Sequence, residues 1–88
     1  MTTLELKQLF PLSRLIECGN ATIEQIEKEK QLRDFISSTT DPQIKLILQL
    51  RYIDQLSWRD VAFVIGGRNT SGSVKQIAHR YLAKTERS

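Results

Sequence analysis

The stretch SWRDVAFVIGGRNTSGSVKQ, residues 57–76, decides the fold because it contains two short amphipathic segments separated by adjacent glycines. Ser57 caps the first segment as a helix, and Asp60 three residues later completes a capping box. Gly66 and Gly67 end this helix. The glycines allow three interpretations: a phosphate-binding loop, a flexible linker, or the turn between the two helices of a DNA-reading pair.

A phosphate-binding loop is excluded because no Gly-Lys-Ser/Thr sequence follows the glycines and no strand precedes them. Helix capping explains Ser57, and His79 lies on a separate segment with no third member of a catalytic triad. One histidine and one cysteine, Cys18, supply no metal-ligand set. We expect Cys18 to be a structural residue in a reducing compartment. The sequence therefore predicts neither an enzyme nor a cofactor.

The chain has 88 residues, which predicts a small core that favours helical packing, oligomerisation or a partner. We find no secretory leader and no apolar run near the ~20 residues that span a bilayer, so we expect a cytoplasmic protein without membrane contact. Residues 1–44 carry seven acids and five bases, whereas residues 45–88 carry three acids and eight bases. The basic half suggests a polyanionic partner, although scattered surface charge also explains a difference of this size.

Residues 1–40 are expected to form a helical oligomerisation segment. Thr2 and Glu5 predict a capping box at its start, and Pro11 should kink this helix or separate it from the next. The pattern from Leu12 to Ser37 favours one long amphipathic helix, continuous through Gly19-Asn20. In the alternative, Gly19 ends one helix and Asn20 or Thr22 caps the next. The apolar stripe expected to pack across a dimer contains Leu12, Ile16, Ile23 and Ile26.

Residues 41–88 are expected to form a second unit of three helices. Asp41-Pro42 combines an N-cap with a proline in the first turn, which is a strong helix start. The last helix should begin between Asn69 and Ser71 and run to about Lys84. Inward-facing positions are Ile44, Ile47, Leu48 and Tyr52 in the first helix, Val61, Ala62, Val64 and Ile65 in the second, and Val74, Ile77, Ala78, Tyr81 and Leu82 in the third. Nothing alternates with a period of two, so the predicted fold is all-α.

Three helices in this order are typical of a tri-helical helix-turn-helix module. Ala62 supplies the small residue where two helices cross, and Gly66 or Gly67 supplies a turn residue that tolerates positive φ. The last helix would present hydrogen-bonding side chains on its outer face to phosphates and base edges. Its candidate DNA-binding residues are Ser73, Lys75, Gln76, His79, Arg80 and Lys84.

Residues 41–84 resemble the last DNA-binding region of bacterial sigma factors. The resemblance rests on two stretches, IKLILQLRYIDQLSWRDVAFVIG followed by SVKQIAHRYLAK. They follow the sigma pattern of a leucine-rich helix ending in Leu-Arg-Tyr, then Leu-Ser, then a helix ending in glycine, and finally a helix starting with Ser-Val-Lys. The chain is more closely similar to small sigma-like regulators of phages and prophages, of the RinA and ArpU late-activator type. That resemblance implies a region-4-like module that binds duplex DNA and regulates transcription.

The chain departs from the sigma pattern in the turn before the last helix, which is about two residues longer. We expect Arg68, Asn69 and Thr70 to form a polar wing at the groove edge, with Asn69 or Ser71 as the N-cap and Ser71 a further DNA contact. Arg59 is a further candidate for DNA binding, either as a phosphate contact or as plain surface charge. Two neighbouring residues are expected to be structural. Trp58 should lie at the edge of the core, and Arg51 should pair with Asp54 or Asp60.

The sequence thus favours a double-stranded DNA-binding regulator, dimeric through its N-terminal segment. Two alternatives stay open. One is a small terminase subunit, which recognises DNA for phage packaging and assembles as a ring. The other is a sigma-like adaptor that binds RNA polymerase and touches DNA weakly.

Overall fold

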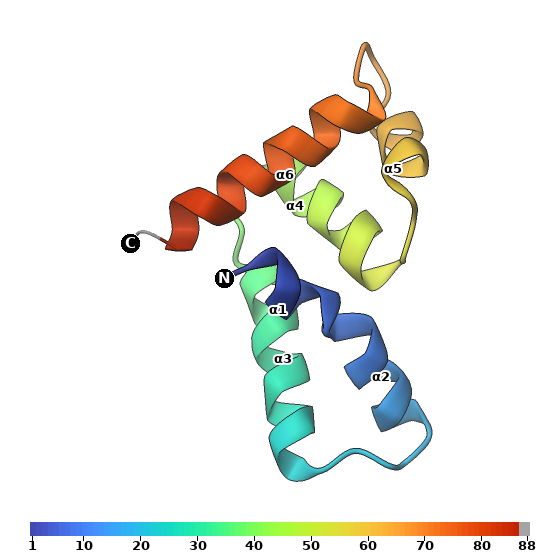
Figure 1. Cartoon of the computed structure of the whole chain (residues 1–88), viewed down its shortest axis with the longest axis vertical. Helices are drawn as coiled ribbons and strands as arrows, with labels where there is room; N and C mark the ends of the chain where they lie inside the picture. Colours follow the sequence, from blue (N-terminus) through green and yellow to red (C-terminus); the bar gives the residue numbers. More distant parts are fainter. Residues whose placement is uncertain (87–88) are drawn as a thin grey trace.

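The computed structural model describes residues 1–86, and this part of the chain is all-helical, as predicted. Its 42 Å long axis runs from the loop at residues 18–22 to the turn at residues 66–70 (Figure 1). The elements are α1 (Thr3–Lys7), α2 (Leu9–Glu17), α3 (Ile23–Ser37), α4 (Pro42–Leu48), η1 (Gln49–Ile53), α5 (Trp58–Ile65) and α6 (Ser71–Glu86).

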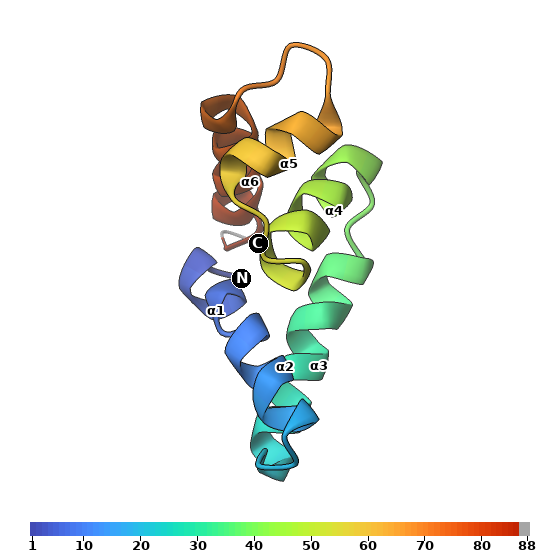
Figure 2. The same ribbon diagram turned by 90° about the vertical axis from the view of Figure 1, so that its right-hand side faces the viewer.

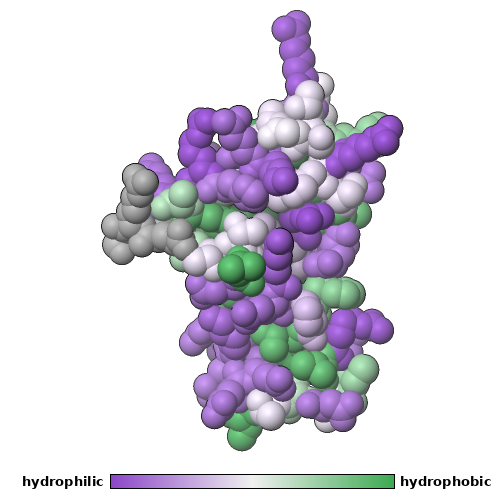
Figure 3. All heavy atoms as spheres, in the orientation of Figure 1, coloured by the Kyte–Doolittle hydropathy of each residue, from purple (hydrophilic) through white to green (hydrophobic). Residues whose placement is uncertain are grey.

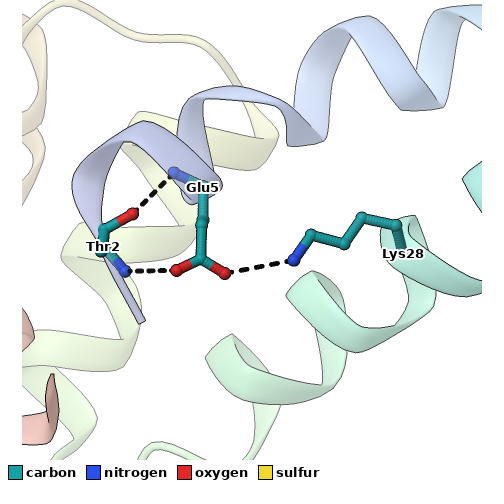
Figure 4. A network of polar contacts seen from close by, with 3 residues as sticks. All are labelled: Thr2, Glu5 and Lys28. Atoms are coloured by element: carbon teal, nitrogen blue, oxygen red, sulfur yellow. Dashed lines mark hydrogen bonds and ion pairs between the residues drawn. The ribbon is translucent and has the colours of Figure 1, made fainter.

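The first helix is short and is fixed at both ends. Thr2 and Glu5 form the predicted capping box, and the second oxygen of Glu5 accepts a 3.1 Å hydrogen bond from Lys28 Nζ on α3 (Figure 4). The first helix is separated from the next, as expected from Pro11, and the break falls at Gln8, between the end of α1 and the start of α2. A proline ring clashes with the carbonyl four residues earlier, which here is that of Lys7, the last residue of α1. Pro11 lies in the first turn of α2, where its missing N–H group costs no intrahelical bond.

The prediction of one continuous helix from Leu12 to Ser37 is wrong. Helix α2 ends at Glu17, Gly19 adopts a φ of 73°, and Thr22 opens α3 with a reciprocal capping box to Gln25. A left-handed glycine followed by a strong cap ends one helix and starts another, as in the alternative interpretation. The two helices therefore pack together as a hairpin (Figures 1 and 2).

Helix α4 begins as predicted, because Asp41 Oδ1 accepts hydrogen bonds from the Gln43 and Ile44 amides. It then widens into η1, a five-residue π-helix that the sequence pattern did not indicate. Gln55 follows η1 with a φ of 60°, a conformation that a residue with a Cβ seldom adopts. The connection from α4 to α5 is therefore made of unusual backbone.

One cluster of buried side chains joins the hairpin to the C-terminal helices. Its members are Leu6, Leu9, Leu12, Leu32, Ile36, Ile47, Leu48, Leu50, Tyr52, Val61, Ala62, Val74, Ala78 and Leu82. Phe35 and Tyr81 add a ring contact between α3 and α6, with centroids 6.2 Å apart. Val64 was expected to face inward, but it is 52% exposed because it lies on the outer side of α5. On the face in Figure 3, hydrophilic side chains dominate, and apolar ones gather over the hairpin.

Candidate nucleic-acid interface

The turn between α5 and α6 is fixed by its own hydrogen bonds. Gly66, with a φ of 76°, ends α5 as predicted, and Gly67 follows with a φ of 66°. The Asn69 Nδ2 donates to the Gly66 carbonyl at 3.0 Å. Thr70 caps α6, since its Oγ1 accepts from the Ser73 amide while Ser73 Oγ accepts from the Thr70 amide. The N-cap is thus Thr70, between the expected Asn69 and Ser71.

A second cap fixes the start of α5, the helix that packs most extensively on α6. Ser57 Oγ accepts a 3.1 Å hydrogen bond from the Asp60 amide, as expected. Within the described residues, Asp60 does not return a bond to the Ser57 amide, so the predicted capping box is half formed. Ala62, buried at 6% exposure, lies in the shared core with Val74 and Ala78 of α6. Caps and small residues together hold the two helices close.

The outer face of α6 is polar and open. Lys75, Gln76, His79 and Arg80 are exposed, as is Lys84 near the end of the helix. Ser73 differs, because it is half-buried and its hydroxyl is occupied by the cap. Lys75 and His79 border one concavity beside α6, whereas Arg80 and Lys84 border another on the α4 side. The basic side chains therefore flank a central strip that contains Gln76.

A hollow of about 420 Å³ lies at the N-terminus of α6. It brings four of the candidate residues together: Arg59, Asn69, Thr70 and Ser71. The first amides of a helix and a nearby guanidinium attract anions. Asp60 also lines the hollow and opposes that attraction. Arg68 is exposed on the turn and lines none of these three concavities.

Charge is balanced in the hairpin and unbalanced on the α5–α6 side. In residues 1–86, the ion pairs are Arg14–Glu17, Lys28–Glu5 and Arg33–Glu29. Every one lies within residues 5–33. Among the side chains of residues 1–85, no acidic partner lies within 4 Å of Arg59, Arg68, Lys75, Arg80 or Lys84. Unpaired cations on one side of a protein give a positive potential that attracts polyanions.

Trp58 lies at the edge of the core, where the sequence placed it. Its ring meets Tyr52 and His79 edge-on, with centroids 6.5 and 5.9 Å away. Arg51 stacks over the ring with its Cζ 4.9 Å from the centroid and donates from Nη1 to the Leu56 carbonyl at 2.9 Å. The expected pairing of Arg51 with Asp54 or Asp60 is therefore wrong, although the residue is structural.

The expected oligomerisation residues do not share one surface. Leu12 is buried in the core, and Ile16 is half-buried in the hairpin. Ile23 and Ile26 are 75% and 45% exposed at the start of α3. Their separation follows from the hairpin, which turns α3 back along α2 and so divides the stripe that a continuous helix would have kept.

Sequence reasoning missed two features of this region. Phe63 is 86% exposed on α5 beside Arg59. The inward positions expected for this helix leave out Phe63, so helical periodicity already indicates that its side chain is exposed. The π-helix η1 has no such signal, because its five residues are compatible with an ordinary α-helix.

The described residues contain neither a group of metal-ligating side chains nor a membrane-spanning helix. Among residues 1–86, no three His, Cys, Asp or Glu side chains gather into a group that could hold a metal ion. No helix in the same part of the chain is long and apolar enough to cross a membrane.

Comparison with known proteins shows the family to which the chain belongs. Residues 8–83 match the family described as "Protein of unknown function (DUF1492)", and the chain belongs to that family. No curated protein and no solved structure matches the chain. The match includes α2 to α5 and nearly all of α6, so the hairpin and the polar face of α6 fall within one family unit.

Proposed function

We propose that this protein is a double-stranded DNA-binding transcriptional regulator in which α4, α5 and α6 act as a helix-turn-helix module. The observation that carries the proposal is the exposed row on α6, Lys75, Gln76, His79 and Arg80. The helix that bears it is capped by Thr70 and Ser73 and packs against α5. Side chains of this kind on an anchored helix suit the major groove. The unpaired cations around the row suit the phosphate backbone.

The resemblance of residues 41–84 to sigma-like regulators supports the same function. It favours a regulator of phage or prophage type, working in the cytoplasm of a bacterial host. Under this proposal Gln76 faces base edges, and Arg59 with the start of α6 holds a backbone phosphate. Ser73 contributes by fixing Thr70 and the helix start, since its hydroxyl is already bonded.

We further propose a homodimer that forms through the hairpin. Ile23 and Ile26 are apolar and exposed, and they belong to the start of α3, which lies at the opposite end of the long axis from the 66–70 turn (Figure 1). That placement leaves both copies of α6 free for DNA. A light-scattering mass of one chain at micromolar concentration contradicts the dimer, and a ring of many chains favours the packaging alternative.

One observation favours a second candidate, the adaptor that binds RNA polymerase. Phe63 and Val64 are 86% and 52% exposed on α5, and exposed apolar side chains of this kind mark protein contacts. Substituting Phe63 with Ser separates the candidates. If this variant keeps DNA affinity and loses polymerase capture, the adaptor role holds alongside direct DNA binding, whereas a parent protein that captures polymerase without binding duplex DNA supports the adaptor role alone.

The deciding experiment is selection of bound sequences from random duplex DNA, followed by affinity measurements on the selected site at several salt concentrations. We expect a defined site and an affinity that falls steeply with salt, because several phosphates are neutralised. Recovery of random sequences with no enrichment, or affinity that does not depend on salt, contradicts the proposal.

A further inference from the structure

A recessed pocket lies between α1, η1 and α6, on the flank of the proposed DNA-facing surface. Its volume is about 250 Å³, and its lining comes from four elements, since Trp58 at the start of α5 also contributes. Lys7 comes from the end of α1, Arg51 from the π-helix, and Lys75 with His79 from α6. Within the described residues, no Asp or Glu lines this pocket.

The three strong cations around the pocket are uncompensated. In residues 1–86, Lys7, Arg51 and Lys75 form no ion pair. Arg51 is also held in place, because Trp58 supports its guanidinium and the Leu56 carbonyl takes one of its five N–H groups. Converging like charges repel one another, so a dianion between them would relieve the repulsion and gain charge-assisted hydrogen bonds.

A buried hydroxyl at the same place points to a bound ligand. Tyr52 lines the pocket and is 2% exposed, yet its Oη has no hydrogen-bond partner among residues 1–86. Burial raises the pKa of Tyr52 and so keeps the phenol protonated at physiological pH. The Arg51 charge and the Thr3 hydroxyl act against this rise, and the Thr3 hydroxyl lies near Tyr52 Oη without forming a hydrogen bond of normal geometry. Native proteins rarely leave a buried hydroxyl unpaired without a functional reason.

The backbone at this site is also unusual. Arg51 and Tyr52 both belong to η1, and π-helical turns occur frequently at functional sites. Gln55, with its positive φ, continues the same connection and donates from Nε2 to the Tyr52 carbonyl. Unusual backbone, a positive cluster and an unpaired buried hydroxyl therefore meet at one pocket.

We propose that this pocket binds a phosphate group, held by Lys7, Arg51 and Lys75, with the Tyr52 and Thr3 hydroxyls as further donors. A planar guanidinium fork and two ammonium groups match the oxygens of a phosphate dianion in charge and geometry. The phosphate belongs either to a small phosphorylated molecule or to the backbone of bound DNA. Lys75 and His79 belong both to this pocket and to the candidate DNA-binding set, whereas Lys7, Arg51 and Tyr52 belong to the pocket alone. The pocket can therefore be tested apart from the proposed DNA-binding function through these three residues.

The test is a titration of the full chain with inorganic phosphate at constant ionic strength, followed by calorimetry and by the fluorescence of Trp58, the only tryptophan. We expect saturable binding that Lys7→Gln weakens about tenfold through loss of one charge-assisted bond. Lys30→Gln is the matched control, since Lys30 is exposed on α3 and does not line the pocket. Absence of saturation by both methods, or equal affinities in the two variants, overturns the proposal.

Tyr52→Phe gives a second, independent readout. The variant keeps the ring and removes an unpaired hydroxyl, so we expect unchanged or higher stability in denaturant together with weaker phosphate binding. Unchanged phosphate affinity removes the hydroxyl from the site and contradicts its proposed role as a donor.

The same variants identify the source of the phosphate. If Lys7→Gln weakens duplex binding and phosphate competes with DNA, the pocket holds a backbone phosphate. If Lys7→Gln leaves duplex affinity unchanged while weakening phosphate, the ligand is a free phosphorylated molecule. A protein that binds phosphate but no duplex at all supports the pocket and contradicts the DNA-binding proposal, so the two are distinguishable.

Discussion

Glu5 and Lys28 join the first helix to the third: the Lys28 Nζ lies 3.1 Å from Glu5 Oε2, while Glu5 Oε1 accepts from the Thr2 amide. One carboxylate therefore closes the first turn of α1 and ties that turn to α3. Since Lys7 and Thr3 lie on α1, this contact also positions one wall of the phosphate pocket.

The contribution of this ion pair should depend on pH. The Lys28 hydrogen bond lowers the pKa of Glu5 from its ordinary value of 4.5, so between the folded and unfolded pKa values the unfolded state binds more protons. The stabilisation is complete above the unfolded value and is lost as pH falls through the folded one. Glu5→Gln keeps the cap acceptor and removes the charge, so it should cost less than about 1 kcal/mol at neutral pH.

Urea unfolding of the parent and Glu5→Gln at several pH values measures this effect. The two proteins should converge in acid, and a Lys28→Met background should abolish their difference at neutral pH. A difference that stays constant from neutral pH into acid contradicts the assignment of the effect to the charge.

The two glycines on either side of the α5–α6 turn should respond oppositely to alanine. Gly66 has a φ of 76° and a ψ of −161°, a region that a Cβ disfavours, so Gly66→Ala should destabilise by about 1–3 kcal/mol. Gly72 lies in the first turn of α6, and a Cβ there meets only Thr70 Oγ1 at 3.9 Å. Gly72→Ala should stabilise by roughly 0.5 kcal/mol. Thermal unfolding of both variants measures the signs, and equal signs contradict this account of the turn.

The buried cluster predicts that α1 unfolds together with the rest of the protein. Leu6 is fully buried, so Leu6→Ala should cost about 2–5 kcal/mol in global stability. Leu4, on the same helix and 74% exposed, is the control, and Leu4→Ala should change stability by less than about 0.5 kcal/mol. Denaturant unfolding followed by far-UV circular dichroism, which reports on all the helices together, measures both. A Leu6→Ala cost near that of Leu4→Ala contradicts a shared core.

The proposed DNA-facing row predicts a division of roles on α6. Lys75→Ala and Arg80→Ala should each weaken binding across all sequences and lower the salt slope by about one. Gln76→Ala should relax sequence preference and leave the slope unchanged. Lys30→Ala, on the distant hairpin, should change neither. Fluorescence anisotropy with selected and scrambled duplexes measures all four variants, after circular dichroism has shown that they fold. Parent-like binding by both basic variants contradicts the assignment of α6.

Local signals in the sequence located most helix ends. Thr2, Asp41, Ser57 and Gly66 all act as their residue types predict, because a cap is decided by a few adjacent residues. The prediction of a continuous helix through Gly19-Asn20 failed for a different reason. Packing α3 against α2 stabilises the protein more than extending α2 into one long helix would, and this tertiary effect has no local signal.

The candidate site was predicted as a list of residues but not as an arrangement. Periodicity placed Lys75, Gln76, His79 and Arg80 on the outer face of α6. It did not show that Lys7 of α1 and Lys75 of α6 line the same pocket, because no local sequence pattern encodes the proximity of two segments so far apart in the chain. The π-helix that presents Arg51 and Tyr52 to them was likewise invisible, because its residues satisfy α-helical periodicity.

The π-helical turn also constrains how this family can vary in length. Such a turn accommodates one residue more than an α-helical turn, so a relative shorter by one residue between Gln49 and Ile53 would carry an unbroken α-helix there. The side chains within the turn would then point in different directions, because the extra residue that the wide turn absorbs would be gone. Tyr52 would leave the core and Arg51 would leave Trp58. Relatives that retain the full length of this segment are therefore the ones in which the phosphate pocket should be sought.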